Sequence, residues 1–399
     1  MTLQQLQATY EQAKAKGLAL DMSRGKPESA QLDLSDDLLD AKWVTPPIAE
    51  NGLDCRNYGV LDGIPECKRL FSELMGTPAE QLIVCGNASL NIMYDYLVQM
   101  LPGWLAQGTG VKFLCPVPGY DRHFGMLAQL GIEMVNVPML ADGPDMAMIA
   151  ELVKDPAVKG AICVPKYSNP EGKTFSDDVV RAFAALQPAC PDFRGIWDNA
   201  YLVHGLYDDG DVLLNVHEAA KAYGSENFFI EVCSFSKITF PGASVSCLAA
   251  SSANIAAIKA RMNVQTIGHD KLNQLRHVRY FNNLAGIKAH MKKHANLIRP
   301  KFEAVLDILA RDLTGVATWT VPRGGYFISL DLPEGTAKRT AQLLKEAGVT
   351  LTPAGATFPH GHDPHDRNLR IAPTFPPMEE LVVATELLTI CAQLAIAEK

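Results

Sequence analysis

The sequence predicts an α/β protein whose large domain is built around a mostly parallel seven-stranded sheet and whose smaller domain is α+β. The first observation is an alternation between residues 80 and 255, where short β-rich segments are separated by stretches long enough for crossover helices. The second is that several of these segments are apolar on successive residues, which is typical of strands covered on both faces. The third is the length of 399 residues, which favours two domains over one.

Seven segments carry the strand signal. In chain order they are QLIVCG (81–86), VKFLCPV (111–117), GIEMVNVPM (131–139), GAICVPKY (160–167), FRGIWDNAY (193–201), NFFIEVCSF (227–235) and SVSCLAAS (244–251). Parallel neighbours need crossover connections, so the spacers between these segments are expected to place helices on the faces of the sheet.

The pattern changes near residue 295, which divides the chain into a large domain (46–294) and a small domain formed by both ends (1–45 and 295–399). The N-terminal segment predicts an amphipathic helix that begins after a Thr2 cap and ends near Gly17. The later elements are a helix (300–313), a hairpin-like segment with two glycines (318–332), a second helix, a strand in LRIAP (369–373) and a closing helix over roughly 378–397.

Composition narrows the classes of partner. The net charge of −8 and the pI near 5.7 argue against a surface that neutralises nucleic-acid phosphates, so we expect no nucleic-acid partner. The N-terminus lacks the apolar core of a secretory signal. The most apolar segment, residues 381–397, is interrupted by Glu386 and Gln393, so no membrane span is expected. These features predict a cytoplasmic protein.

Polar residues follow several predicted strands, and ligands of open α/β sheets bind at the carboxyl ends of strands. Ser89 follows QLIVCG and a Gly turn, at the start of a helix, where backbone N–H groups and the helix dipole suit a phosphate. A simple helix cap explains Ser89 equally well. The glycine fingerprint of a nicotinamide enzyme is absent from this turn.

Three further strand ends carry aromatic, amide and acidic side chains. Tyr120 follows VKFLCPVP, where packing is the commoner explanation of an aromatic ring, and Asn169 lies in an Asn-Pro turn signal. Asp198 ends a nearly apolar segment and is followed by Tyr201. A carboxylate there is costly to desolvate without a cationic partner, which makes Asp198 a strong functional candidate.

Lys237 follows the apolar segment NFFIEVCSF and is flanked by Ser234 and Ser236. A lysine at a strand end can extend its amine into solvent. Alternatively, a partly desolvated amine has a lowered pKa and can attack a carbonyl to form a Schiff base. The second interpretation is favoured, because one sheet edge collects this lysine with the other polar strand ends.

An ordered set of motifs spans nearly the whole chain: NYGVLDGIPE, GNASLN, PVPGY, YSNPEG, DNAY, SFSK and LRIAPTFP. This set resembles the fold-type I aminotransferases that use pyridoxal 5′-phosphate. The sequence is similar in particular to a bacterial aspartate aminotransferase branch that carries SRGKP near the start and DKLNQLRHVRYF in the middle. Single motifs of this kind are weak, but seven in the family's order are specific.

The resemblance implies roles around the cofactor ring. Lys237 would hold the cofactor as a Schiff base and then carry the proton between the substrate α-carbon and the cofactor. Asp198 would pair with the pyridinium nitrogen, so that the ring withdraws electrons. Asn169 and Tyr201 would hydrogen-bond the ring hydroxyl oxygen, and Tyr120 would stack on the ring.

The resemblance also implies roles at the two ends of the site. The cofactor phosphate would be held by Asn87, Ala88, Ser89 and Ser234, with Tyr58 reaching the phosphate of the partner subunit in a homodimer with shared active sites. Arg370 would bind the substrate α-carboxylate in a bidentate manner, which a lysine does poorly. Gly25 would let the backbone approach the same carboxylate beside Asn169.

One segment departs from the family pattern. Many relatives carry a phosphate-binding arginine several residues after the lysine, whereas this chain has Ser244 in PGASVS. Either Ser244 and the backbone suffice, or Lys271, Arg276 or Arg24 replaces the missing cation.

The cluster PHGHDPHD (359–366) contains possible metal ligands, but its Pro and Gly content favours a loop before Arg370 over a metal site.

The leading hypothesis is a ping-pong aminotransferase that takes small amino acids and 2-oxo acids, with aspartate and oxaloacetate as one couple and 2-oxoglutarate and glutamate as the other. The cations available for a distal carboxylate are Arg24, Lys26, Lys271, Arg276 and Arg279. Alternatives with the same core residues are an aromatic or alanine aminotransferase and a β-lyase. A ligand-sensing module of a transcription regulator ranks lower, because only about 20 residues precede SRGKP.

Overall fold

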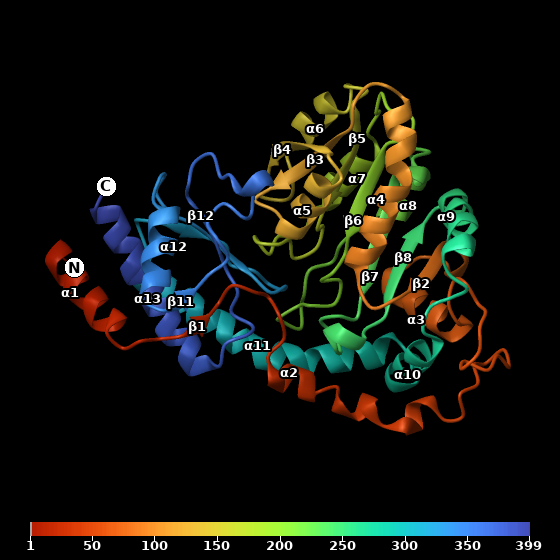
Figure 1. Cartoon of the computed structure of the whole chain (residues 1–399), viewed down its shortest axis with the longest axis horizontal. Coiled ribbons are helices and arrows are strands. Elements are labelled where there is room, and N and C mark those ends of the chain that lie inside the picture. The colour runs from red at the N-terminus through yellow and green to blue at the C-terminus, as the bar shows by residue number, and fades with distance from the viewer. Residues whose placement is uncertain (1) are drawn as a thin grey trace.

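A computed structural model describes residues 2–399 and shows a large part around one sheet and a smaller part that contains both chain termini (Figure 1). The large sheet has seven strands in the order β2-β8-β7-β6-β5-β3-β4, and β8 alone runs antiparallel to its neighbours. The strands are β2 (Leu82–Cys85), β3 (Lys112–Val117), β4 (Glu133–Pro138), β5 (Val158–Cys163), β6 (Arg194–Asp198), β7 (Phe229–Ser234) and β8 (Ser246–Ala250). The predicted α/β class with a mostly parallel seven-stranded sheet is confirmed.

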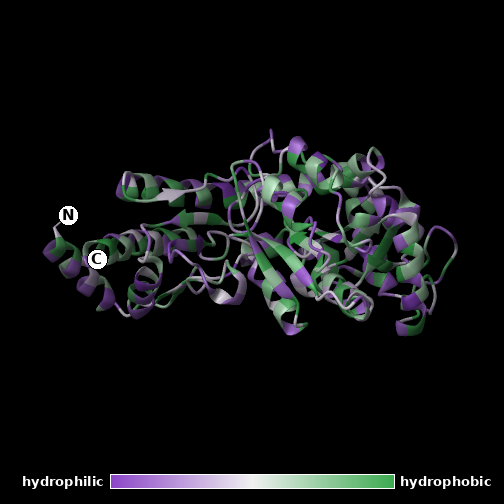
Figure 2. Ribbon diagram, turned by 90° about the horizontal axis from the view of Figure 1, so that it is seen from above, coloured by the Kyte–Doolittle hydropathy of each residue, from purple (hydrophilic) through white to green (hydrophobic). Residues whose placement is uncertain are grey.

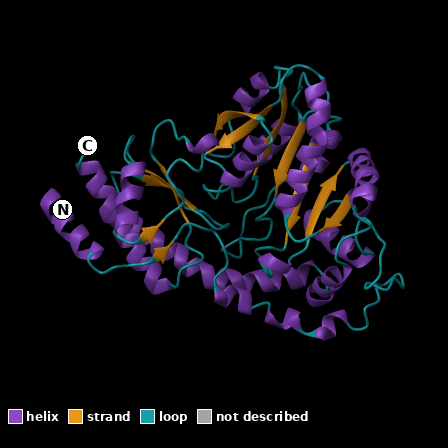
Figure 3. Cartoon of the chain, in the orientation of Figure 1, coloured by secondary structure: helices purple, strands orange, loops and turns teal. Residues whose placement is uncertain are grey.

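Helices cover both faces of this sheet (Figure 3). They are α4 (Ser89–Ala106), α5 (Asp121–Gln129), α6 (Met146–Leu152), α7 (Asp177–Ala184), α8 (Val216–Lys221) and α9 (Ser252–Gln265). Successive strand residues enter different cores: Phe113 and Cys115 pack with α4, α5 and α9, whereas Leu114 packs with α6, α7 and α8. Burial on both faces explains why these strands are apolar on successive residues.

Three helices pack against the strands at one edge of the sheet, β2, β8 and β7. The helices are α3 (Pro65–Met75), α10 (Lys271–Phe281) and α11 (Leu284–Leu313). Cys233 near the end of β7 and Phe235 directly after the strand pack into the core that they share with these helices. The short 3-10 helices are η1 (Asp36–Leu39), η2 (Ala41–Val44), η3 (Ala79–Gln81), η4 (Glu226–Phe228), η5 (Pro241–Ala243) and η6 (Pro359–Gly361).

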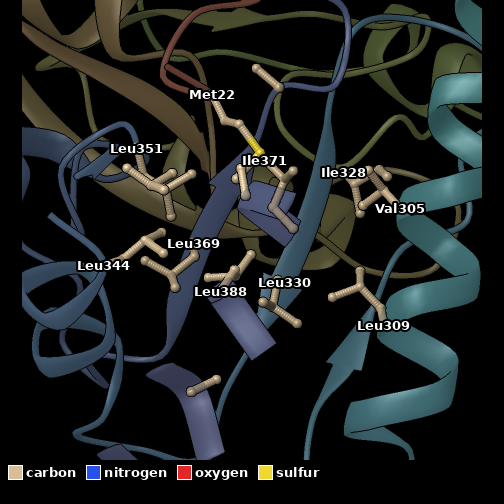
Figure 4. Close-up of a cluster of buried hydrophobic side chains, with 14 of the residues drawn as sticks. Met22, Val305, Leu309, Ile328, Leu330, Leu344, Leu351, Leu369, Ile371 and Leu388 are labelled. Carbon is tan, nitrogen blue, oxygen red and sulfur yellow. The ribbon is translucent and has the colours of Figure 1, made fainter. Parts of the chain in front are cut away.

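The smaller part combines the N-terminal segment with the C-terminal hundred residues. Its elements are α1 (Leu3–Lys14), β1 (Leu20–Asp21), α2 (Ser29–Asp33), β9 (Thr318–Trp319), β10 (Ile328–Asp331), α12 (Ala337–Glu346), β11 (Val349–Thr350), β12 (Asn368–Ile371) and α13 (Met378–Ala397). The sheet β12-β10-β9 is antiparallel, and β1 pairs in parallel with β11. One core joins Met22 from the N-terminal segment to Leu330, Ile371 and Leu388 (Figure 4).

Helix α11 connects the two parts (Figure 1). It runs without a break through residue 294, so the predicted domain boundary falls inside one helix of 30 residues. Its first turns contribute Ile287 and Met291 to the large part, and its later turns contribute Phe302 and Val305 to the core of the smaller part. The helix therefore belongs to the cores of both parts and joins them.

Helix α13 is the one described helix whose length and apolar composition would allow it to cross a membrane. In the structure, Leu381, Leu388 and Cys391 of this helix pack into the core of the smaller part. The outer helices alternate between hydrophobic and hydrophilic residues (Figure 2), as expected of helices with one face against a core. Core packing accounts for the apolar composition of α13.

Candidate active site

A cavity of about 110 Å³ lies where the carboxyl ends of several sheet strands meet. Eight of the predicted site residues line it: Ala88, Ser89, Tyr120, Asn169, Asp198, Tyr201, Ser234 and Lys237. Leu90, Val164, Ala200 and Ser236 complete the lining. Residues separated by up to 149 positions in the sequence thus face one space, which the parallel topology brings about.

Lys237 enters the cavity from a turn directly after β7. Its Nζ atom lies 4.8 Å from the centre of the Tyr201 ring, and it makes no hydrogen bond or ion pair among residues 2–399. Burial lowers the pKa of this amine, and the nearby charge of Asp198 opposes that shift only in part. The neutral, nucleophilic form of the amine is therefore favoured compared with that of an exposed lysine.

Asp198 is the last residue of β6 and is 2% exposed. Its Oδ2 atom lies 2.9 Å from Nε2 of His123 on α5. Its Oδ1 atom is buried and has no hydrogen-bond partner among the described residues. A buried carboxylate oxygen without a donor is costly, so this atom is suited to a protonated ring nitrogen of a ligand.

His123 was not among the predicted site residues. A signal was present, since His123 follows Tyr120 by three positions at the start of a helix. The Tyr120 and His123 rings lie 5.0 Å apart in an edge-to-face arrangement. The imidazole therefore supports both Asp198 and the ring of Tyr120.

Tyr120 and Tyr201 both line the cavity. Burial raises the pKa of each phenol, and the nearby carboxylate of Asp198 adds to the effect. Both hydroxyl groups are thus protonated at neutral pH and can donate hydrogen bonds to a ligand oxygen.

The start of α4 forms one end of the cavity. Ala88 is the N-cap residue and Ser89 is the first helical residue, so Ser89 does not act as a helix cap. Ser234 Oγ donates to Ser236 Oγ at 3.0 Å, and Ser236 Oγ donates to the carbonyl of Asn87 at 3.0 Å. Two segments, the start of α4 and the end of β7 with the turn after it, thus bring three hydroxyl groups to the positive end of an 18-residue helix, an arrangement suited to a phosphate.

Ser244 lies outside the cavity lining. Its hydroxyl donates to the carbonyl of Val245 at 3.2 Å, and its own carbonyl accepts from Asn273 at 2.8 Å. The guanidinium of Arg276 is likewise held by Asn273 Oδ1 at 2.5 Å. Lys271 at the start of α10 is 6% exposed and forms no ion pair within residues 2–399.

Arg370 on β12 reaches the cavity through Asn169. Its Nη1 atom donates to Asn169 Oδ1 at 3.1 Å and to Asp121 Oδ1 at 2.8 Å, and Nη2 donates to Thr352 Oγ1 at 3.0 Å. The guanidinium also lies 4.8 Å from the centre of the Phe327 ring. Its Nε atom is buried without a partner in the described chain.

Gly25 packs against the same Phe327 ring. A Cβ atom at Gly25 would lie 2.4 Å from Phe327 Cζ, so only glycine fits at this approach. Arg24 and Lys26 on either side are exposed, and Lys26 Nζ lies 3.7 Å from the centre of the Phe375 ring. Gly25, a predicted substrate-binding residue, thus packs against the same Phe327 ring that contacts the Arg370 guanidinium.

Two predictions concern residues away from the cavity. Tyr58 is 78% exposed and does not line the cavity of its own chain. Within the loop 359–366, Asp363 accepts hydrogen bonds from the backbone N–H groups of His365, Arg367 and Asn368. No cluster of potential metal ligands is found within residues 2–399.

Comparison with known proteins agrees with this geometry. The family model described as "Aspartate amino-transferase" matches residues 1–399. The chain is 46% identical to the aspartate aminotransferase of Corynebacterium glutamicum, over 98% of this chain and 92% of that protein. The chain belongs to the aspartate amino-transferase family. It is therefore an aminotransferase.

Two solved structures are also similar to this chain. The crystal structure of an aspartate transaminase from C. glutamicum matches with a TM-score of 0.95 and 44% identity, covering 99% of this chain and 96% of that one. LysN, the α-aminoadipate aminotransferase of Thermus thermophilus, matches with a TM-score of 0.76 at 20% identity, covering 99% and 97%, and was solved with N-(5′-phosphopyridoxyl)-L-leucine. At that identity the likeness concerns the fold alone.

Proposed function

We propose that the protein transfers an amino group between L-aspartate and 2-oxoglutarate, giving oxaloacetate and L-glutamate, with pyridoxal 5′-phosphate held by Lys237. The observation that carries the proposal is the pairing of two groups in one cavity: the partly desolvated amine of Lys237 and the unpartnered Oδ1 atom of Asp198. The homologue from C. glutamicum supports the choice of aspartate.

The residues present fit this cofactor. The pyridine nitrogen would meet Asp198 Oδ1, which has no donor in the chain itself. The ring would lie beside Tyr120, with Asn169 and Tyr201 near its hydroxyl oxygen. When bound, the group would supply an electron sink for negative charge that develops on the substrate α-carbon.

The chain's own groups would handle the proton. Because burial lowers the pKa of Lys237, its amine can act as a nucleophile and then accept or donate the proton at the substrate α-carbon. Asp198 would keep a proton on the ring nitrogen, and His123 at 2.9 Å fixes the carboxylate for that task. The reaction would follow a ping-pong order. The first half-reaction would leave the amino group bound to the enzyme, and the second would transfer it to the 2-oxo acid with the same lysine.

The phosphate end would depend on neutral donors. Asn87, Ala88 and Ser89 at the start of α4, with Ser234, would hold the phosphate through backbone N–H and hydroxyl groups. Tyr58 is exposed in a single chain, which suits a hydroxyl that acts in the cavity of a partner subunit in a homodimer. Ser244 would contribute only if its hydroxyl left the Val245 carbonyl.

The substrate α-carboxylate would bind to Arg370 in the presence of Asn169, close to the backbone of Gly25. For the distal carboxylate, Arg279 is a poor choice because it donates to the carbonyls of Trp43, Pro46 and Ile48. Arg24 is exposed, forms no ion pair within residues 2–399 and adjoins Gly25. Lys26 lies over the Phe375 ring and Arg276 donates to Asn273, so we propose that Arg24 binds the distal carboxylate.

The decisive experiment compares Lys237→Ala with a matched control, Lys166→Ala. Lys166 is also a partly buried lysine, with a pKa lowered by burial to about 8, but its amine donates to the Leu202 carbonyl and lies outside the cavity. Wild type and Lys166→Ala should show the absorption band of covalently held pyridoxal phosphate and should transaminate. Lys237→Ala should lose the band and at least about 1,000-fold in kcat.

Two outcomes would overturn the proposal. One is a wild-type protein that binds no pyridoxal phosphate, and the other is a Lys237→Ala variant as active as wild type. A panel of amino donors with 2-oxoglutarate tests the substrate separately. Activity with aromatic donors or alanine but not with aspartate would replace the substrate assignment and leave the reaction class intact.

A further inference from the structure

The turn that carries Lys237 has carbonyl groups that its own backbone does not satisfy. The N–H groups of Ile238 and Thr239 both bond to the Phe235 carbonyl, at 2.9 and 2.8 Å. If the turn continued as a helix, the N–H of residue 241 would bond to the carbonyl of Lys237. Residue 241 is proline, which has no N–H, so this carbonyl needs another donor.

Side chains from other segments take the place of the missing backbone donors. His204 Nε2 lies 3.3 Å from the Lys237 carbonyl oxygen, and Tyr326 donates its hydroxyl to the same oxygen at 3.4 Å. His290 Nε2 lies 2.9 Å from the Ile238 carbonyl oxygen. Three segments far apart in the sequence thus hold two consecutive carbonyls of the turn.

These donors are connected to one another. Gln31 Nε2 donates to the Tyr326 hydroxyl at 3.0 Å and lies 3.2 Å from His294 Nδ1. His294 Nε2 lies 3.1 Å from His290 Nε2, which closes the ring of contacts back to the turn. Gln31 is fully buried, so the N-terminal segment is tied to the lysine turn through this network.

The imidazoles of the network carry no charge at neutral pH. Burial lowers the pKa of His204 and of His294 to about 3, and it also lowers the pKa of His290. The charge of Lys237 contributes to the shift at His204. The network thus acts through hydrogen bonds and places no positive charge beside the amine.

The same residues also form a wall beside the amine. The rings of Tyr201, His204 and Tyr326 lie 5.5 to 5.9 Å from one another. Lys237 Nζ lies 4.8 Å from the Tyr201 ring, so the amine and its backbone carbonyl are both held by this aromatic cluster. Gly325 N–H donates to the His204 carbonyl at 3.0 Å, which fixes Tyr326 relative to His204.

We infer that His204, Tyr326 and Gln31 are positioning residues for Lys237: they cap the carbonyl that Pro241 leaves open and so hold the amine desolvated and aimed into the cavity. This inference rests on the proposed role of Lys237. Its consequence is that the N-terminal segment, through Gln31, contributes to the chemistry of a lysine more than 200 positions later.

Tyr326→Phe removes one hydroxyl and keeps the ring. A looser turn admits water to the amine, and water favours the protonated form. The midpoint of the pH titration of the lysine-linked cofactor band should rise by about half a unit to one unit, and kcat should fall about three- to tenfold while KM changes less than about twofold. Tyr96→Phe is the matched control, because its buried hydroxyl bonds to Arg194 Nε at 2.9 Å.

His204 allows a rescue test. His204→Leu fills the space but has no donor, whereas the amide of His204→Gln can reach the Lys237 carbonyl in the manner of Nε2. The leucine variant should show the raised titration midpoint and the lower kcat, and the glutamine variant should recover most of both. A role in packing alone predicts the reverse order of the two variants.

The results separate the two proposals. If wild type forms no lysine-linked band, the proposed function fails before the network is tested. If wild type forms the band, and Tyr326→Phe and His204→Leu titrate and turn over as wild type does, the positioning inference is overturned. The same shift in Tyr96→Phe would also overturn it, because the effect would then follow from the loss of any buried hydroxyl.

Discussion

The two ends of the candidate site are built in different ways. At the proposed substrate end, one buried guanidinium, Arg370, is held by Asp121, Asn169 and Thr352. At the proposed phosphate end, the start of α4 and the hydroxyl groups near Ser89 would bind the phosphate, and the cavity lining contains no arginine. One end thus concentrates its charge in a single side chain, and the other distributes it over neutral donors and a helix dipole.

The difference predicts how each end tolerates change. A fixed bidentate cation cannot be replaced by a neighbour, since its partners are arranged for a planar guanidinium. A set of backbone N–H groups and hydroxyls loses only one of several contacts when a side chain is removed. Substitutions should therefore be far more damaging at the substrate end than at the phosphate end.

The largest effect is expected for Arg370→Lys. The ammonium keeps the charge but cannot bind a carboxylate in a bidentate manner, and Asp121, Asn169 and Thr352 lose donors. We expect kcat/KM to fall about 100- to 1,000-fold for every amino donor alike. Steady-state kinetics with aspartate, alanine and an aromatic donor measures this.

The control for that variant is a substitution of Arg367, which directly precedes β12. Arg367→Lys changes an exposed arginine that lies 4.0 Å from Asp331, and it should leave kcat/KM within about twofold. A loss of kcat/KM confined to dicarboxylic donors would mean that Arg370 binds the distal carboxylate. That result would contradict the proposed binding of the α-carboxylate by Arg370.

The sequence predicted the sheet better than it predicted the supports of the site. Strand ends such as Asp198 and Lys237 could be found because local patterns mark both the strand and the polar residue after it. His123, Gln31 and Tyr326 were missed, because their importance lies in contacts between segments up to 295 positions apart. No local pattern encodes the contacts of Gln31 and Tyr326, which arise only when α11 and the chain ends pack. His123 has a local signal in its spacing from Tyr120, but its contact with Asp198 forms only when α5 packs beside β6.

Ser244 was predicted to bind the cofactor but does not line the cavity, for a similar reason. Ser244 was chosen because it stands near the position of a missing arginine, yet its hydroxyl donates to its neighbour's carbonyl. Position along the chain places a residue near a site but does not decide which way its side chain bonds. The predicted boundary near 294 falls inside α11, and a continuous helix gives no composition change from which its course between the two parts could be predicted.

An intermediate effect is expected for Arg24→Ala. Arg24 is exposed and lies next to Gly25, so its removal should leave the binding of the α-carboxylate intact. The loss of one charge-assisted contact should lower kcat/KM for aspartate about ten- to 100-fold and leave alanine within about twofold. Arg339→Ala, which removes an arginine paired with Glu398, is the surface control. An equal loss for alanine would show that Arg24 supports the whole substrate end.

The smallest effect is expected for Ser89→Ala at the phosphate end. The backbone N–H groups of α4 and the hydroxyl of Ser234 remain, so the affinity for pyridoxal phosphate should fall only about three- to tenfold. Ser251→Ala is a sharp control, because Ser251 is the N-cap of α9 and accepts from Asn254 N–H at 3.2 Å.

The two serine variants should affect different quantities, the free energy of unfolding in one case and the cofactor affinity in the other. Ser251→Ala should lower the free energy of unfolding by about 1 kcal/mol and leave cofactor affinity unchanged. Ser89→Ala should lower cofactor affinity and leave the unfolding of the cofactor-free protein nearly unchanged, because Ala88 occupies the cap position. Cofactor titration and denaturant unfolding measure the two quantities. A loss of affinity above about 100-fold in Ser89→Ala would mean that this end, like the substrate end, depends on a single side chain.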